Sequence, residues 1–245
     1  MKLSSVLATP RSFRTTRWSL VRLAIAEEPV EAMQAMEALC EAYWYPLYAF
    51  IRRSGYKPED AEDLTQGFFA RMLDRDILMS ADPSRGKLRS FLLTCLRRYM
   101  ASEHERARAL KRGGGLVTSL DAEWAEDRYR HEPRDNMSPD RLFQRRWALT
   151  VLEHALRLLE EEYASRGKEN QFGTLRPFLG MSGEPGPTYE QAAASLGLTV
   201  NNVKTQIFRL RQRWRELLFE QVSLTLDEPS SDEIKAELAE LMQCV

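Results

Sequence analysis

Apolar residues recur every three or four positions along most of this chain, and this spacing predicts helices. One such stretch runs from about residue 30 to 54 and carries Met36, Leu39, Cys40, Tyr43, Leu47 and Ile51 on one face. The next opens at Pro58 and directs inward Ala61, Leu64, Phe68, Met72 and Leu73. A third, from Lys87 to about Arg112, has the core stripe Leu88, Phe91, Leu92, Cys95, Leu96 and Tyr99. Strand-like alternation is missing, so the sequence predicts an all-α fold.

Changes in composition divide this helical chain into parts. Residues 13–112 hold the first set of periodic stretches, and three glycines from Gly113 close it. Residues 113–139 are polar and acidic, which is typical of a flexible linker with little structure of its own. Periodicity returns over 140–222, interrupted by an insert at 165–187 that includes one short apolar set. Residues 223–245 form an acidic extension, in which Ser231 is expected to cap a short helix.

The stretch from Pro187 to Leu218 has the pattern of two helices joined by a tight turn. Thr188 and Thr199 stand where N-caps are expected, and Gly197 stands where a helix end needs a left-handed residue. The second helix has an apolar stripe made of Val203, Ile207, Leu210, Trp214 and Leu217. Its polar positions are Thr199, Asn201, Asn202, Lys204, Thr205, Gln206, Arg209 and Arg213. This pattern is typical of a DNA-reading helix-turn-helix, although an ordinary surface hairpin with a basic solvated face would share it.

The residue types on these faces suit nucleic acid. Asn and Gln pair with adenine, Arg pairs with guanine, and Lys or Thr contacts phosphate. A second basic element is the helix expected from Lys87, where cations far outnumber Glu103 and Glu105. Its candidate contacts to DNA are Arg85, Lys87, Arg89, Arg97, Arg98, Arg106 and Arg108, together with Phe91. Such a density of cations favours a phosphate backbone as partner, whereas the helix in isolation would be read as a solvated one.

Composition narrows the classes of function that remain possible for this chain. The 245 residues carry a formal net charge of −1, so DNA contact has to come from local basic faces. The three cysteines are far apart and lack metal-ligand spacing, which argues against a disulfide framework or zinc site. Asp60, Glu62 and Asp63 have no histidine or further carboxylate at the spacing that would complete a metal set. We therefore expect no metal, no cofactor and no enzyme activity, and a cytoplasmic chain, because no leader or membrane span is apparent.

Three motifs together resemble the sigma-70 family of bacterial RNA polymerase sigma factors. Residues 61–73 (AEDLTQGFFARML) resemble the region 2 helix that grips the polymerase clamp helices. Residues 87–98 (KLRSFLLTCLRR) look like the helix that opens and reads the −10 element. Residues 189–198 (YEQAAASLGL) and 202–211 (NVKTQIFRLR) are similar to region 4.2, which reads the −35 element. Lacking a long region 1.1 and a full region 3, the chain resembles the extracytoplasmic-function type, and residues 13–21 and 43–48 look like a planctomycete subgroup.

The resemblance implies a non-enzymatic initiation factor with two helical domains. Core polymerase would be bound at its β′ clamp helices by Asp60, Asp63, Leu64, Gln66 and Phe69, and a further contact would be made to the β flap. The −10 element would be read by the basic helix and the −35 element by the helix-turn-helix. Phe91 and Arg98 stand where many relatives carry Trp and Asn, so the −10 sequence is left open. An anti-sigma partner and the promoter are left open as well.

The runner-up interpretation is a free-standing helix-turn-helix regulator whose N-terminal domain binds a ligand or partner. It predicts DNA binding without polymerase. For the acidic tail we expect a short amphipathic helix through Ile234, Leu238 and Leu241 that docks on one of the domains and competes with DNA. A solvated tail without a partner is the alternative, and composition alone favours it.

Overall fold

The computed structural model describes residues 17–25, 29–73, 76–110, 120–132, 137–180, 186–227 and 229–244. All regular structure in these ranges is helical, which confirms the predicted all-α class. The first group of elements is α1 (Arg17–Ala24), α2 (Pro29–Arg53), α3 (Pro58–Leu73), α4 (Asp76–Met79), η1 (Pro83–Arg85), α5 (Leu88–Leu110) and α6 (Leu120–Arg130). The second is α7 (Pro139–Ala164), α8 (Glu169–Leu175), η2 (Arg176–Leu179), α9 (Tyr189–Leu196), α10 (Val200–Ser223) and α11 (Ser231–Gln243).

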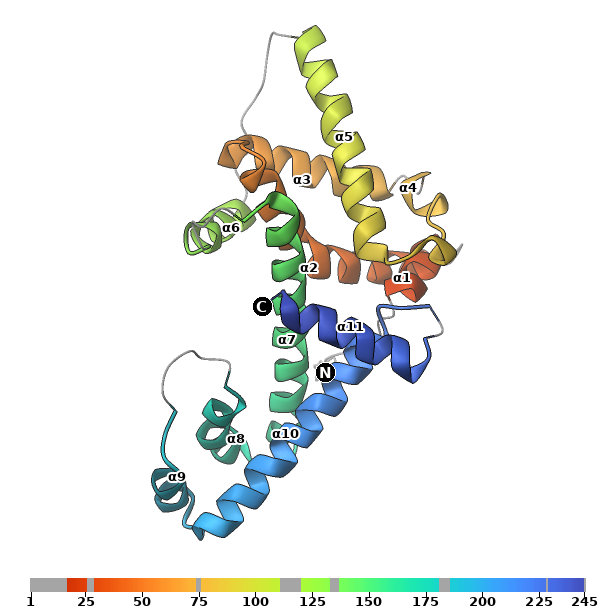
Figure 1. The fold of residues 1–245 in the computed structure, drawn as a ribbon. Coiled ribbons are helices and arrows are strands. Elements are labelled where there is room, and N and C mark those ends of the chain that lie inside the picture. The colour runs from red at the N-terminus through yellow and green to blue at the C-terminus, as the bar shows by residue number, and fades with distance from the viewer. Residues whose placement is uncertain are drawn as a thin grey trace, which may run out of the picture.

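Helices α1 to α5 form one end of the molecule (Figure 1). Helix α2 is its centre, because α1 and α3 both pack on it and Leu39, Leu47 and Ile51 are fully buried. Helix α3 approaches α5 closely at Gly67, where a Cβ atom would stand 2.2 Å from the Tyr99 hydroxyl. An alanine at this position would require the Tyr99 side chain to shift, so the glycine allows the close approach of α3 and α5 that is observed.

Helix α7 connects the two ends of the molecule (Figure 1). It packs against α2 at one end and against α10 at the other, and Trp147 on it is buried. The buried residues of both groups form one continuous apolar cluster. Two domains that move freely on a flexible linker were expected, whereas here the second group is anchored to the first through the α2–α7 contact.

Helix α6 corrects the linker prediction more directly. Its residues lie in the range that the sequence assigns to a segment with little structure, yet they form a helix that packs on α2 and α3. Hydrogen bonds and an ion pair hold this helix in place. Arg52 donates from Nε and Nη2 to the Glu126 carboxylate at 2.8 and 2.9 Å, and the Tyr48 hydroxyl donates to the same group at 2.8 Å. The linker looked unstructured because much of its attachment is ionic and it has no extended apolar stripe.

A buried carboxylate marks the junction between α2, the end of α6 and α7. Glu132 is buried, accepts a hydrogen bond of 2.6 Å from the Tyr45 hydroxyl, and forms ion pairs with Arg145 and Arg146. A buried carboxylate is tolerated only with such partners. The junction therefore sets the position of α7, and with it the second group, relative to α2.

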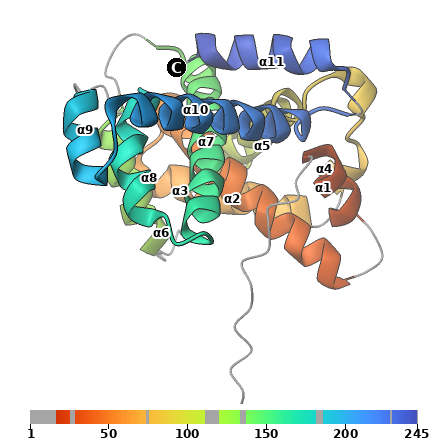
Figure 2. The ribbon, with the colours of Figure 1, turned by 90° about the horizontal axis from the view of Figure 1, so that it is seen from below.

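The second group is organised around α10, which α9 and α11 flank in the view from below (Figure 2). The 165–187 insert contributes α8, whose Phe172 and Leu175 are buried against this group, as the predicted short apolar helix requires. Helix α11 is present as expected, but its cap is Ser230 rather than Ser231. The Ser230 hydroxyl oxygen accepts from the Glu233 backbone N–H, and the Ser230 backbone N–H donates to the Glu233 carboxylate.

Candidate nucleic-acid interface

The α9–α10 pair has the local geometry that its sequence predicts. Thr188 and Gln191 form a reciprocal capping box at the start of α9, with bonds of 2.8 and 3.2 Å. Gly197 ends α9 with a φ of 63°, a conformation that favours glycine. Thr199 caps α10 by accepting from the Asn202 backbone at 3.3 Å. The caps and the turn therefore fix the angle at which α10 leaves α9.

The inner face of α10 is the predicted apolar stripe. Val203, Ile207, Leu210 and Leu217 are buried, and Trp214 is half-buried against the same core. This packing leaves the opposite side of the first turns in solvent. The exposed members of the predicted −35 set are Thr199, Asn201, Asn202, Lys204, Thr205 and Arg209. They form one polar surface, the α10 face, at the end of the molecule farthest from the C-terminal end of α5 (Figure 1).

Two predicted members of the −35 set are engaged inside the protein instead. Gln206 is hydrogen-bonded to Gln171 of α8. Arg213 is hydrogen-bonded to Glu162 of α7, its Nη2 at 2.6 Å, and also pairs with Glu216 and Glu220. The hydrogen bond to Glu162 is the main reason why the pKa of Arg213 is raised above its usual value. In this conformation both side chains hold α10 onto its neighbours.

Phe208 belongs to the α10 face but was not singled out from the sequence. Its ring is 65% exposed, between Lys204 and Thr205 on one side and Arg209 on the other. A single exposed apolar side chain is common on protein surfaces, so it is the position of Phe208 among the polar side chains of the α10 face that makes it a candidate contact. The signal was available, because Phe208 falls outside the apolar stripe of α10.

The predicted polymerase-binding residues lie on α3 in three different environments. Asp60, Asp63 and Gln66 are exposed, while Leu64 is half-buried. Gln66 donates to the Glu62 carboxylate at 2.8 Å. Phe69 is buried and packs edge-on against Phe68, so its side chain belongs to the core. The surface that α3 presents to a partner is thus acidic, with a small apolar component.

The basic residues of α5 and of the turn before it divide into paired and exposed members. Lys87 lies 2.5 Å from the carboxylates of both Glu237 and Glu240, and Arg89 pairs with the same two groups. The hydrogen bond from Lys87 is the main reason why the pKa of Glu240 is lowered.

Further along α5, Arg97 forms an ion pair with Asp140 at the start of α7. Phe91 is half-buried and packs near Trp18, with ring centroids 6.5 Å apart. Arg98 and Arg106 are exposed, and Arg106 pairs with Glu103 at 2.8 Å. The side chains of the remaining predicted members, Arg85 and Arg108, lie outside the described residues.

Arg89 is more deeply placed than a DNA-contacting side chain needs to be. Only 4% of it is exposed, its guanidinium lies 4.4 Å from the Trp147 ring centroid, and its Nε donates to Gln144 at 2.8 Å. Both partners belong to α7. Arg89 therefore anchors the start of α5 to the second group, which corrects its assignment as a directly accessible −10 contact.

The described residues contain no cluster of His, Cys, Asp or Glu that could hold a metal ion. Burial raises the pKa of the Cys40 thiol to about 11, so this cysteine is an inert, partly buried residue. None of the described helices combines the length and the apolar character that crossing a membrane requires. These observations direct attention to the charged helical surfaces.

Residues 39–110 match the family model of sigma-70 region 2. They cover most of α2 together with α3, α4, η1 and α5, the helices that carry both the acidic α3 surface and the basic α5 residues. The chain therefore contains a sigma-70 region 2 domain, the kind found in sigma factors, which are not enzymes. A region 2 domain implies a role in transcription initiation, with binding to core RNA polymerase and to the promoter −10 element. No curated protein and no solved structure matched the chain.

Proposed function

We propose that this protein is a promoter-specific sigma factor of the extracytoplasmic-function type that reads a −10 element through α5 and a −35 element through α9–α10. The observation that carries the proposal is the combination of a region 2 match with a second, capped helix pair on the same chain. Between α5 and α7, α6 is the only described element, which favours a sigma factor without a region 3 domain. The cytoplasm, where polymerase acts, is the proposed location.

The proposed polymerase contact uses the exposed part of α3. Asp60 and Asp63 would face a basic partner surface on the β′ clamp helices, and Leu64 would supply the apolar contact at its centre. Gln66 lies beside them, whereas Phe69 would support the surface from within. The second group would contact the β flap and hold the α10 face toward upstream DNA.

The proposed upstream reading uses the first three turns of α10. Their side chains match those that read bases in a major groove, Asn201 and Asn202 for adenine and Arg209 for guanine. The exposed Phe208 ring suits the methyl group of thymine. Lys204 and Thr205 would contact phosphates and fix the register.

Run-off transcription tests the proposal. Core RNA polymerase is supplied with genomic fragments of the source organism, with and without this protein, and the 5′ ends of the transcripts are sequenced. We expect new start sites that share −10 and −35 elements and that require the protein. Tight DNA binding by the protein alone, with no polymerase-dependent transcript, would instead identify a free-standing regulator.

A further inference from the structure

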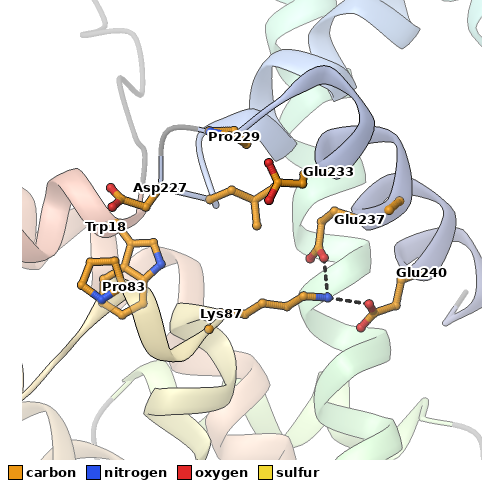
Figure 3. Close-up of a pocket in the computed structure, with 11 residues that line it drawn as sticks. Trp18, Pro83, Lys87, Asp227, Pro229, Glu233, Glu237 and Glu240 are labelled. Atoms are coloured by element: carbon orange, nitrogen blue, oxygen red, sulfur yellow. Dashed lines mark hydrogen bonds and ion pairs between the residues drawn. The ribbon is translucent and has the colours of Figure 1, made fainter.

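Helix α11 touches both groups of helices. Ile234 and Leu241 are buried and Leu238 is half-buried against α10 and α7, so the apolar stripe of the tail docks on the second group. The neighbouring side of the same helix points toward the start of α5 in the first group (Figure 3). The tail thus has one apolar and one acidic contact, made to different parts of the chain.

The acidic contact is made with two cations that the sequence places in the −10 set. Glu237 and Glu240 both reach Lys87 (Figure 3). The same two carboxylates also pair with Arg89. Glu237 is only 3% exposed, although a helix docked by apolar contacts alone has no need of a buried carboxylate. The pairing is therefore a specific feature of the contact rather than a by-product of an acidic tail.

The two cations differ in how firmly they are held. Arg89 is buried on Trp147 and would stay on α7 if α11 left, since its contacts to the ring and to Gln144 do not involve the tail. The Lys87 side chain is partly exposed and lies beside a pocket lined by Trp18, Pro83 and Glu233. Removal of α11 would therefore free Lys87. Glu240 is half exposed, so α11 would begin to separate from α5 at this carboxylate.

We propose that α11 is an intramolecular acidic clasp whose carboxylates occupy the place of DNA phosphates at Lys87, so that the −10 surface is partly covered until α11 is released. The inference rests on the proposed function for the identity of the DNA element. A carboxylate and a phosphate oxygen use the same ammonium donors, and the two carboxylates take up donors of Lys87 and offset its charge. Docking of α11 therefore competes with a phosphate for Lys87 and weakens DNA binding at the start of α5.

The test compares two charge reversals on the same helix. Glu240→Lys breaks the clasp at its rim, whereas Asp232→Lys changes the net charge equally at an exposed position that pairs only locally with Lys235. The probe is a fluorescein-labelled 30-base-pair duplex of mixed sequence, and the full chain is titrated at several salt concentrations. We expect Glu240→Lys to bind about tenfold more tightly than Asp232→Lys at 0.1 M salt, with a steeper salt dependence.

A second variant shows whether the gain passes through α5. Adding Lys87→Ala to Glu240→Lys should remove most of the gain, because Lys87 is the cation that this charge reversal frees. Amide exchange over residues 231–243 should also rise when the unaltered protein binds the duplex. Equal affinities for the two charge reversals, or a gain that survives Lys87→Ala, would overturn the proposal.

These measurements need no polymerase, so they are independent of the run-off assay. Failure of run-off transcription alone would count against the sigma-factor function and leave the clasp intact as a cover for a DNA-binding cation. If run-off succeeds while exchange over α11 stays unchanged on DNA binding, the clasp is overturned and α11 is a structural brace.

Discussion

The two basic surfaces, on α10 and on α5, look alike in sequence but differ in the folded protein. The first turns of α10 hold their polar side chains in solvent, with Lys204 and Arg209 exposed. At the start of α5, Lys87 and Arg89 are each paired with carboxylates from the other end of the chain. Whether a cation is free to bind DNA therefore depends on acids far away in the sequence. Here the second group of helices neutralises part of the positive charge of the first.

The largest expected effect concerns the junction that brings these two regions into contact. Glu132→Ala would leave the half-buried Arg145 and Arg146 without their carboxylate and Tyr45 without its acceptor. We expect a loss of about 3–5 kcal/mol in the free energy of unfolding. Urea denaturation measures it, and Asp127→Ala, at an exposed position on α6, is the matched control. A loss below about 1 kcal/mol would show that the junction is not what positions α7.

The structure explains why the α9–α10 pair could be predicted and the state of the α5 cations could not. Caps, the Gly197 turn and the apolar stripe of α10 are local, so neighbouring residues determine them. The partners of Arg89 and Arg97 stand 148 and 43 positions away, at Glu237 and Asp140. Periodicity along one helix carries no information about such pairs.

The other differences have equally physical causes. Helix α6 was missed because polar groups such as Glu126, rather than an apolar stripe, provide much of its attachment. Phe69 was assigned to the polymerase-binding surface by the family resemblance, whereas the fold buries it beside Phe68. Arg213 was assigned to the DNA face because Glu162, which engages it, is 51 positions away on α7.

The second prediction distinguishes the α10 side chains that read bases from those that hold the helix in place. Arg209→Ala should cost about 1–3 kcal/mol in binding to the cognate upstream element and relax preference at one base pair. Lys204→Ala should weaken cognate and scrambled sites alike and reduce the salt slope. Arg213→Ala, whose side chain is bonded to Glu162, should leave the preference unchanged. Fluorescence anisotropy on cognate and scrambled duplexes distinguishes these three outcomes, and equal losses on both for Arg209→Ala would make it a phosphate contact.

The third prediction concerns a substitution that disturbs the packing of α5 on α3 without altering the second group of helices. Gly67→Ala would place a methyl group against the Tyr99 hydroxyl, forcing α3 and α5 apart at a cost of about 1–3 kcal/mol of folding free energy. Gly173→Ala in α8 is the control, because its Cβ atom would meet nothing within 4 Å and should stabilise by about 0.5–1 kcal/mol. Thermal unfolding reports both changes. Opposite signs are expected, and a stable Gly67→Ala would mean that Tyr99 can move aside.

The smallest effect is a dependence on pH at the tie between α6 and α2. The hydrogen bonds from Arg52 are the main reason why the pKa of Glu126 is lowered in the folded protein, against the opposing effect of burial. A carboxyl whose pKa is lower when folded adds stability above its unfolded pKa and loses it as the pH falls toward the folded value. Glu126→Gln should therefore be less stable than the unaltered protein by about 1 kcal/mol at pH 7, and the difference should shrink as the pH is lowered through the ordinary carboxyl range. Urea unfolding of both proteins at pH 7 and pH 4 measures this change. Asp127→Asn on the exposed side of α6 provides the baseline, and a difference that stayed constant between the two pH values would show that Glu126 contributes through packing rather than charge.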